Sequence, residues 1–340
     1  MRDRALNHVW ESGALDARLA RAVLAPFGWA FGAAVAIRNL AYDRAWLPQH
    51  ALALPAIAVG NLTVGGTGKT PVSAWLAARL RARGARPAIV LRGYGGDEPL
   101  VHARLNPDVL VLADADRVRA AIRAREAGAT VVVLDDGFQH RRAKRDADLV
   151  LLSADRFGPV RLLPAGPWRE PLAALGRASA VVVTRKSASR IRARELLAHA
   201  MRFAPRAAGA LVHLPVDALV ACAGDARRDA VALAGTDVLA ITAIADARPF
   251  ESQLRALGAR VQSAAYDDHH LFTVLDAEAL ARRATRVAWV VCTLKDAVKL
   301  EPVWPRAGPP LWYLSQRVSV EAGADALEAL IAGVISRTAP

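Results

Sequence analysis

A glycine-rich segment carries the residues with the clearest chemical potential. It runs from Val59 to Pro71 and ends in Gly68-Lys69-Thr70. Glycines allow backbone N–H groups to turn inward around phosphate oxygens, and the start of a following helix adds positive partial charge. The Lys69 amine can reach the β- and γ-phosphates of a nucleotide, and the Thr70 hydroxyl can bind Mg²⁺. The segment therefore predicts a nucleotide-binding phosphate loop.

This loop departs from the general P-loop pattern at one position, because Thr63 stands where the first glycine is expected. Three later glycines supply the flexibility that the loop needs. The alternative is a glycine-rich turn that only caps a helix. The residues expected to contact the nucleotide are Asn61, Gly65, Gly66, Thr67, Gly68, Lys69 and Thr70.

Two adjacent carboxylates follow the next strongly apolar run. Residues 130–134 read Thr-Val-Val-Val-Leu and lead directly into Asp135 and Asp136. P-loop proteins place the carboxylate that holds Mg²⁺ at the end of such a strand. We therefore predict that Thr70 and this acidic pair hold the metal, with Asp135 as the first choice of carboxylate and Asp136 as the second. The alternative is a turn in which Asp caps the next segment.

The elements that position these residues alternate between short apolar strands and longer helical stretches, which predicts a parallel α/β sheet. In the first set we expect strands at 54–59, 88–91, 130–134, 149–152 and 181–184, and helices at 71–83 and 115–127. The second set should contain strands at 238–242, 260–263 and 289–292, with helices at 250–257, at 276–285 and from Val320 onward.

An uncharged N-terminal segment precedes these elements. Residues 22–37 carry no charge and are flanked by Arg18, Arg21, Arg38 and Arg44. Sixteen residues fall short of the roughly 20 that span a bilayer. We therefore interpret the segment as an interfacial or membrane-dipping helix, and the alternative is a buried helix of the soluble domain. The expected domains are a membrane-associated segment at 1–45, a P-loop core at 46–215 and a C-terminal α/β domain at 216–340.

The overall composition limits the class of protein. The 340 residues are 54% apolar and 23% charged, which suits a folded protein with a substantial core. The net charge of +13 favours anionic partners, although it also fits solvated arginines on ordinary surfaces. No nucleic-acid-binding motif occurs. The two cysteines, Cys222 and Cys292, lie in apolar stretches and predict buried structural thiols rather than a metal site.

Further motifs follow in a fixed order along the chain. They are Gly60-Asn61, Gly65-Gly66-Thr67-Gly68-Lys69-Thr70-Pro71, Arg92-Gly93-Tyr94-Gly95, Gly96-Asp97-Glu98-Pro99, Asp135-Asp136-Gly137-Phe138-Gln139-His140, Leu163-Pro164-Ala165-Gly166-Pro167, Arg169-Glu170-Pro171, Asp268-His269-His270 and Thr293-Leu294-Lys295-Asp296. Together they resemble the tetraacyldisaccharide 4′-kinase family, the lipid A 4′-kinases of Gram-negative bacteria.

The resemblance implies a P-loop NTPase-like α/β/α core, a second, smaller α/β/α domain and an N-terminal membrane-associated helix. It implies transfer of the γ-phosphate of ATP, with Mg²⁺, to the 4′-hydroxyl of a tetraacylated glucosamine disaccharide 1-phosphate. The product would be the 1,4′-bisphosphate precursor of lipid A. The enzyme would work at the cytoplasmic face of the inner membrane, with no nucleic acid and no obligate protein partner.

The resemblance also implies roles for individual residues. Asp97 would accept the proton of the sugar hydroxyl, paired with a histidine that we assign as His269, although spacing alone leaves His270 open. Lys69 would complete the catalytic set. Outside the family context, a turn at Asp97 and a packed histidine pair would be the simpler interpretations. The expected substrate-binding residues are Arg117, Gln139, His140, Arg169 and Glu170, for which surface salt bridges are the alternative.

Two features depart from the family pattern. The family has a longer insert between its Arg-Gly-Tyr-Gly and Gly-Asp-Glu-Pro motifs, and Leu294 stands where the family has Glu. Two other classes of protein remain as alternatives. One is a P-loop ATPase or GTPase of the switch or metallochaperone type, which would hydrolyse nucleotide without a lipid acceptor. The other is a membrane-associated nucleotide sensor that would bind ATP without turnover.

Overall fold

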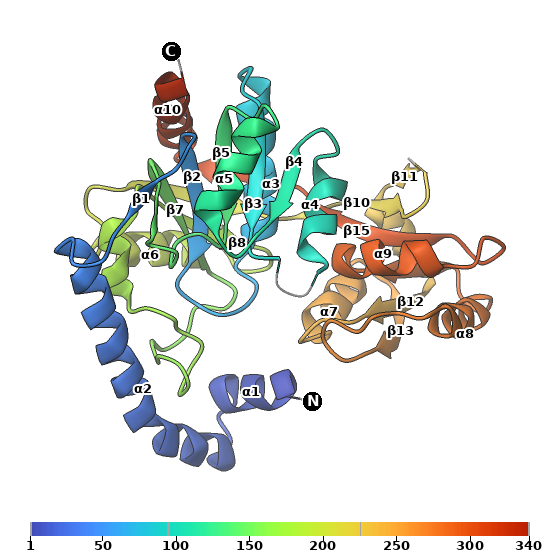
Figure 1. Cartoon of the computed structure of the whole chain (residues 1–340). Helices are drawn as coiled ribbons and strands as arrows, with labels where there is room; N and C mark the ends of the chain where they lie inside the picture. Colours follow the sequence, from blue (N-terminus) through green and yellow to red (C-terminus); the bar gives the residue numbers. More distant parts are fainter. Residues whose placement is uncertain (1, 94–95, 225, 339–340) are drawn as a thin grey trace. The chain divides into compact units, whose positions relative to one another are not determined.

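The chain forms two compact units (Figure 1). The computed structural model describes residues 2–93, 96–224 and 226–338. The unit that we call the core unit comprises the described residues of 6–93, 105–215 and 318–338. The smaller unit comprises the described residues of 2–5, 96–104 and 216–317. Each unit contains its own β-sheet.

The core unit is built on an eight-stranded sheet with the order β16-β9-β8-β7-β2-β5-β3-β4. Every neighbouring pair in it is parallel except β16 with β9. Its strands are β2 (Ala56–Asn61), β3 (Pro87–Leu91), β4 (Leu110–Ala113), β5 (Val131–Asp135), β7 (Ala147–Ser153), β8 (Ala180–Arg185), β9 (Ala208–His213) and β16 (Ser319–Ala322). A separate parallel ribbon pairs β1 (His50–Ala51) with β6 (Ala143–Lys144).

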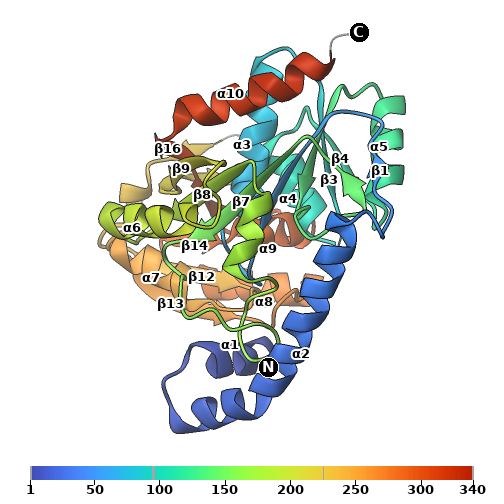
Figure 2. The same cartoon turned by 90° about the vertical axis from the view of Figure 1, so that its left-hand side faces the viewer.

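Helices cover both faces of this sheet and produce an α/β/α arrangement. On one face, α3 (Lys69–Ala82) and α10 (Ala324–Ile335) pack through Leu76, Leu80 and Ile331. The other face carries α5 (Arg117–Glu126), α6 (Arg190–Met201) and the 3₁₀ turn η1 (Leu172–Arg177). Figure 2 shows α10 running beside β16 and β9. Because both faces are covered, the central strands are apolar throughout rather than alternating.

The N-terminal part of the core unit consists largely of one long helix. After α1 (Arg2–Glu11), α2 runs from Leu15 to Asp43, so its 29 residues extend about 43 Å at about 1.5 Å per residue. By length and composition α2 could cross a membrane, and only 11% of its most apolar window is buried. The uncharged segment alone suggested a helix too short to span. The helix is longer than this segment, because the charged turns on both sides continue it, and the expectation of an interfacial or membrane-dipping helix stays a prediction.

The smaller unit has a six-stranded mixed sheet with the order β11-β10-β15-β14-β12-β13. Strands β15, β14, β12 and β13 are mutually parallel, whereas β10 is antiparallel to β11 and β15. The strands are β10 (Val216–Ala221), β11 (Arg227–Arg228), β12 (Asp237–Thr242), β13 (Arg260–Ala265), β14 (Trp289–Cys292) and β15 (Leu311–Gln316).

This second sheet also lies between helices. The helices α8 (Val274–Ala284) and α9 (Leu294–Leu300) pack on one face, and α7 (Arg248–Ala256) packs on the other. Short 3₁₀ turns are η2 (Ala230–Leu233), η3 (Glu301–Val303) and, in the core unit, η4 (Ser336–Thr338). Cys222 and Cys292 are both free and buried here, which confirms the prediction of structural thiols. The expected smaller α/β/α domain is therefore present.

The predicted domain ranges placed each of two segments in one unit, and the structure groups it with the other. Residues 96–104, with most of α4 (Glu98–Leu105), belong to the smaller unit, where Arg104 pairs with Glu301 and donates to the carbonyl oxygen of Cys222. Residues 318–338 belong to the core unit, because β16 pairs with β9. Both assignments depend on pairing between segments far apart in the sequence.

We expected a helix from Val320 onward, and the structure corrects the residue at which that helix begins. Val320 lies in β16 and pairs with Val212 of β9, and the helix α10 begins only at Ala324. Gly323 separates the two elements with a φ of 76°, a left-handed conformation that glycine adopts readily. Residues 318–322 alternate between apolar and polar side chains, as a strand does, but the prediction assigned those from Val320 onward to the helix that follows.

Candidate active site

The phosphate loop connects β2 to α3, as its sequence predicted. Gly65 and Gly68 have φ angles of 98° and 85°, which side chains with a Cβ rarely adopt. A Cβ on Gly68 would also lie 2.5 Å from Cδ1 of Leu214. Gly68 directly precedes α3, and within the described chain no side-chain hydrogen bond caps the N-terminus of this helix. This conformation fits the cradle that phosphate oxygens require.

Buried polar side chains hold this loop in place. Asn61 is completely buried and donates through Nδ2 to Oγ1 of Thr67 over 2.9 Å. The Thr184 hydroxyl donates to the Thr67 carbonyl oxygen over 2.8 Å, from the end of β8. The amide of Val64 donates to the carbonyl oxygen of Pro167 over 2.8 Å. The loop is thus fixed by contacts with three other segments of the core unit.

Lys69 and Arg169 meet at Asp136. Lys69 Nζ lies 3.4 Å from Oδ1 of Asp136, and Arg169 Nη1 lies 3.0 Å from both carboxylate oxygens. Burial raises the pKa of Asp136, but the positive charges of Lys69 and Arg169 outweigh it and the net pKa is lowered. Asp136 therefore remains ionised between two cations that the sequence assigned to phosphate or substrate.

Asp135 lies at the carboxyl end of β5, which pairs with β2 beside the phosphate loop. It is 4% exposed, and its Oδ1 accepts hydrogen bonds from the Ser73 hydroxyl and from the Asp136 amide, each over 3.0 Å. Ser73 stands one helical turn after Thr70 on α3. The carboxylate is thus held against the first turn of the helix that carries Thr70.

These residues fit a magnesium–nucleotide site. Mg²⁺ bound with a nucleotide usually keeps water and phosphate ligands and takes only one or two protein carboxylates. Among the described residues, no group of three or more His, Cys, Asp and Glu side chains could hold a metal ion by itself. A hydroxyl and one buried carboxylate beside a phosphate loop are therefore the donor set that this chemistry needs.

The predicted substrate residues Gln139 and Glu170 form part of one buried network. Glu170 is completely buried and accepts hydrogen bonds from Asn39 of α2, from Gln139 and from Arg177. Gln139 also donates to the carbonyl oxygen of Asn61 over 2.8 Å. This network connects the long N-terminal helix to the strand that leads into the phosphate loop. In this structure the Glu170 carboxylate therefore binds the side chains of Asn39, Gln139 and Arg177.

Two other predicted substrate residues lie close to the acidic pair. Arg117 is 3% exposed and donates through Nη1 to the carbonyl oxygens of Asp114 and Ala115. Burial lowers its pKa, partly offset by attraction to Asp136. His140 is partly buried, and its Nε2 has no hydrogen-bond partner among the described residues. Burial, followed by the charges of Arg117 and Arg145, lowers the pKa of His140, which favours the neutral imidazole.

The predicted Asp–His pair forms within the smaller unit. Asp97 precedes α4 and is 3% exposed, and its Oδ2 lies 3.3 Å from Nδ1 of His269. His269 has a φ of 57°, an uncommon value for a residue with a side chain. Its amide donates to Oδ1 of Asp268 and to the carbonyl oxygen of Ala243. The backbone contacts hold the imidazole against the carboxylate.

The structure shows which of the two neighbouring histidines contacts Asp97, a question that their spacing in the sequence left open. His270 stacks on Tyr266, with ring centroids 4.7 Å apart, and its Nε2 lies 3.2 Å from Oδ2 of Asp276 at the start of α8. His269 is thus the histidine that contacts Asp97. Of the Arg-Gly-Tyr-Gly motif, Tyr94 and Gly95 lie outside the described residues.

Sequence reasoning missed several residues that hold the site. Ser73 supports Asp135, Thr184 supports the loop, and Arg177 pairs with Glu170. The spacing of Ser73, three residues after Thr70 on one helix face, could have indicated its position. Thr184 and Arg177 come from segments that approach the loop only in the folded chain, so no local pattern marks them. In the last family motif, Asp296 is completely buried and pairs with Lys299.

Comparisons with known proteins agree with this arrangement. The family model described as tetraacyldisaccharide-1-P 4′-kinase (LpxK) matches residues 20–96 and 95–336. The tetraacyldisaccharide 4′-kinase of Anaeromyxobacter dehalogenans (strain 2CP-C) is 40% identical over 344 residues, covering 89% of this chain and 87% of the relative. That of Halorhodospira halophila (strain DSM 244 / SL1) is 37% identical, covering 96% of each.

A solved structure is also similar. It is described as an "apo" form of LpxK from Aquifex aeolicus in complex with ATP, and it matches with a TM-score of 0.74 and 29% sequence identity. The match covers 93% of this chain and 99% of that one. The family model and the relatives each cover most of the chain, and the phosphate loop, the acidic pair and the Asp–His pair lie inside the matched residues. The chain belongs to the tetraacyldisaccharide 4′-kinase family.

Proposed function

We propose that this protein transfers the γ-phosphate of ATP to the 4′-hydroxyl of a tetraacylated glucosamine disaccharide 1-phosphate. The product is the 1,4′-bisphosphate precursor of lipid A. The observation that carries the proposal is the fixed phosphate loop with Lys69 at its end and a buried carboxylate, Asp135, against the same helix. Family membership supplies the acceptor, because the relatives bear the name of this kinase.

In this proposal the core unit binds the triphosphate. The amides at the N-terminus of α3 donate to phosphate oxygens, and Lys69 neutralises charge on the β- and γ-phosphates. Lys69 lies 3.4 Å from Asp136, so this carboxylate holds the ammonium in place until phosphate competes for it. Arg169, on the other side of Asp136, is placed to bind a phosphate oxygen in the same way.

We propose that Thr70 and Asp135 hold Mg²⁺ with the nucleotide. When bound there, Mg²⁺ would neutralise charge on the β- and γ-phosphate oxygens. The Ser73 hydroxyl and the Asp136 amide both donate to Oδ1 of Asp135. The orientation of Asp135 is therefore fixed by this chain before any ligand arrives.

The smaller unit supplies the proposed base. A sugar hydroxyl is a poor nucleophile near neutral pH, so a positioned carboxylate that accepts its proton assists the transfer. Asp97 accepts this proton, and the imidazole of His269, 3.3 Å away, orients the carboxylate and stabilises its charge. The proton moves from the 4′-oxygen to Asp97 as the bond between that oxygen and the γ-phosphorus forms, while the bond from the γ-phosphorus to the oxygen that bridges the β- and γ-phosphates breaks and ADP leaves.

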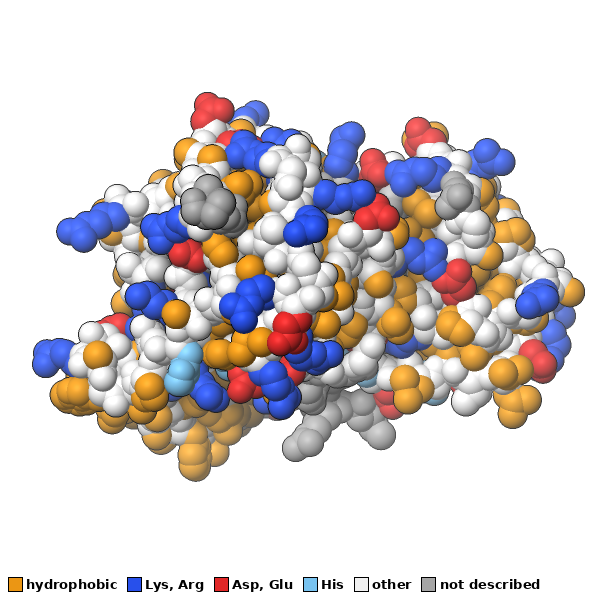
Figure 3. Space-filling view, turned by 45° about the horizontal axis from the view of Figure 1, so that its top comes forward, with side chains coloured by type: hydrophobic (Ala, Val, Ile, Leu, Met, Phe, Trp, Pro, Cys, Tyr) orange, Lys and Arg blue, Asp and Glu red, His pale blue; other side chains and the backbone are white. Residues whose placement is uncertain are grey.

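The long helix α2 fits a membrane-bound substrate. Its outward residues Leu15, Leu19, Val23 and Phe27 recur every fourth position and are each at least 59% exposed. Figure 3 shows hydrophobic side chains gathered at the lower left of the molecule, where α2 lies in Figure 1. We propose that this face inserts into the cytoplasmic side of the inner membrane, which gives the enzyme access to its lipid acceptor.

The test is a transfer assay with γ-labelled ATP and the tetraacylated disaccharide 1-phosphate in detergent micelles. We expect label to enter the lipid in a reaction that requires Mg²⁺. Release of labelled inorganic phosphate without labelled lipid would indicate a hydrolase and overturn the proposal. An assay with the acceptor that already carries a 4′-phosphate is the matched control, because it lacks the hydroxyl that reacts.

A further inference from the structure

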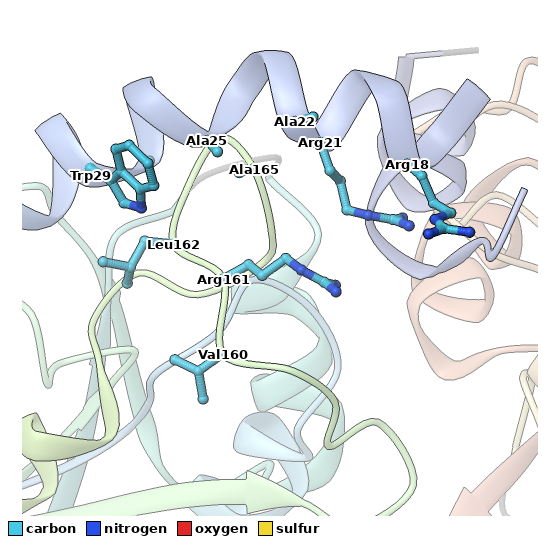
Figure 4. A pocket seen from close by; sticks show the side chains of 10 residues that line it. Arg18, Arg21, Ala22, Ala25, Trp29, Val160, Arg161, Leu162 and Ala165 are labelled. Carbon is cyan, nitrogen blue, oxygen red and sulfur yellow. The ribbon is translucent and has the colours of Figure 1, made fainter. Parts of the chain in front are cut away.

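A cavity of about 500 Å³ lies between α2 and the loop that follows β7, within the core unit (Figure 4). Its lining combines cationic and apolar side chains. The lining residues are Arg18, Arg21, Ala22, Ala25, Gly28 and Trp29 of α2, with Val160, Arg161, Leu162 and Ala165 of the loop. None of them has a role in the phosphate loop or in the Asp–His pair.

The loop is fixed against the helix by close backbone packing. A Cβ on Gly28 would lie 3.3 Å from the carbonyl oxygen of Leu162, and one on Gly32 would lie 2.7 Å from its Cδ1. Glycine within a helix lowers stability by about 1 kcal/mol relative to alanine, so these two positions need another reason. They permit the close approach of Leu162. Trp10 of α1 also donates to the carbonyl oxygen of Pro164 over 3.0 Å. The cavity is therefore a built feature of the fold.

The cationic groups of the cavity lack carboxylate partners. Arg18 and Arg161 make no ion pair with any residue in the described part of the chain, and Arg21 donates to the carbonyl oxygens of Val9 and Ser12. Figure 4 shows the side chain of Arg161 extending from the loop beneath the helix, on the side toward which Arg18 and Arg21 point. Guanidinium groups gathered without counter-charges favour an anionic ligand, and their planar donors suit phosphate oxygens.

The position of the cavity on α2 identifies the kind of phosphate. The exposed apolar side chains Leu15, Leu19, Val23 and Phe27 lie along the same N-terminal stretch of α2 as Arg18 and Arg21, but the two arginines project from the other side of the helix, toward the loop. A helix that buries such a face in a membrane lies at the boundary between headgroups and acyl chains. Basic side chains on the side of the helix away from the acyl chains then lie at the level of the lipid headgroups, and Trp29 has the amphipathic ring that is enriched at this depth.

We propose that this cavity binds the phosphate headgroup of an anionic glycerophospholipid of the membrane. The proposal rests on the proposed membrane association of α2. Arg161 and Arg18 bind the phosphate oxygens, and the apolar side chains of Trp29, Val160 and Leu162 contact the adjoining glycerol and first acyl carbons. A bound lipid of this kind holds α2 and the loop at a fixed depth in the bilayer.

The first test measures vesicle binding by co-sedimentation of the full chain. Vesicles of phosphatidylcholine alone are compared with vesicles that also contain phosphatidylglycerol. We expect Arg161→Gln to weaken binding to the anionic vesicles about fivefold, the effect of one basic residue at a membrane surface, and to leave binding to the neutral vesicles unchanged. The matched control is Arg125→Gln, which removes an exposed arginine of α5 with the same change in net charge.

The second test separates the cavity from general attraction to a charged surface. Short-chain phosphatidylglycerol, kept below its micelle concentration, should quench tryptophan fluorescence in a saturable manner. Trp29→Phe should remove most of this change, because Trp29 lines the cavity. Arg161→Gln should shift the titration to higher lipid concentration.

The outcomes distinguish this proposal from the one on which it rests. If the wild-type chain bound neither kind of vesicle, membrane association itself would fail. If it bound anionic vesicles but Arg161→Gln and Arg125→Gln weakened binding equally, only the headgroup cavity would be excluded. A rise in the KM for the disaccharide 1-phosphate in neutral detergent, with unchanged vesicle binding, would assign the cavity to the phosphate of the acceptor and overturn the phospholipid assignment.

Discussion

At the scale of single residues, the Asp97 carboxylate allows the most direct test of the proposed chemistry. It is nearly buried, paired with one histidine and held at the start of a helix. Asp97→Asn keeps its size but removes its ability to accept a proton. We expect kcat to fall by about 10²- to 10⁴-fold, the usual contribution of a general base, with little change in ATP affinity. Steady-state transfer kinetics and equilibrium nucleotide binding measure the two quantities separately.

Lys69→Met provides the contrast to this variant. Lys69 belongs to the phosphate loop, so its loss should reduce both ATP affinity and turnover. If Asp97→Asn retained near-normal kcat, Asp97 would have another role than proton acceptor, while the assignment of the phosphate loop would stand.

The lowered pKa of His140 predicts how the stability of the folded chain depends on pH. Because the pKa of His140 is lowered in the folded chain, the unfolded chain takes up this proton more readily as the pH falls. The contribution of His140 to stability is thus present above its ordinary pKa of about 6.5 and decreases below it. We expect the free energy of unfolding to fall more steeply for the wild type than for His140→Gln between about pH 7.5 and about pH 5.5.

Urea unfolding at a series of pH values, monitored by circular dichroism, gives this comparison. His50→Gln is the matched control, because His50 is exposed on the short strand β1. Parallel curves for the wild type and His140→Gln would show that the imidazole is protonated equally easily in the folded chain.

At the scale of elements, the turn into α3 depends on one glycine. Gly68 combines a positive φ with a backbone that packs against Leu214. Gly68→Ala should therefore destabilise the core unit by about 1–3 kcal/mol through strain and overpacking. Gly66→Ala is the matched control, since a Cβ at Gly66 meets no atom within 4 Å. Thermal unfolding without nucleotide measures both. Equal melting temperatures would contradict the geometry of the loop.

The exposed face of α2 makes a prediction about the membrane. Replacing Leu19, Val23 and Phe27 together by Ser removes apolar side chains that are each at least 59% exposed. We expect the variant to remain folded but to move from the membrane fraction to the soluble fraction. Ile191→Ser, which removes a similarly exposed side chain on α6, should not change fractionation. Unchanged membrane association of the triple variant would assign attachment to another surface.

At the scale of the whole molecule, the C-terminal helix completes the core unit. Leu327, Ile331 and Val334 of α10 are each at most 4% exposed and belong to the same cluster as the side chains of α3. Burying a large aliphatic side chain contributes about 1.5–3 kcal/mol, so the three together approach the whole stability of an ordinary domain. A chain that ends after Arg317 should therefore fail to fold in its core unit.

Soluble expression and binding of ATP test this expectation. A chain that ends after Ile335 is the control, because it keeps the three buried residues. Normal ATP binding by the chain that ends after Arg317 would show that residues 318–338 are dispensable for the core unit.

Much of the fold follows from local pattern. The strands at 131–135, 149–152 and 238–242 are apolar because both sheets are covered on two faces, and the phosphate loop stands between a strand and a helix, as expected. Other elements were not expected. Segments such as β9 and β16 are short and only partly apolar. They are strands because β9 pairs with β8 and β16, and β16 pairs with β9 at the edge of the sheet. Such pairing has no local signature.

The sequence by itself determined the class of chemistry, and it predicts residues that would perform it. Glycines followed by a lysine and a threonine at this spacing are typical of a loop that binds nucleotide phosphates. The motifs that follow in order along the chain identify the family. Only the tertiary structure decided which histidine contacts Asp97, that Glu170 is buried under Asn39 and Arg177, and that α10 belongs to the core unit. The physical reason is that local backbone preference acts over a few residues, whereas Asp97 and His269, Asn39 and Glu170, and α3 and α10 lie more than 100 residues apart in the sequence and approach each other only when burial of the sheets brings them together.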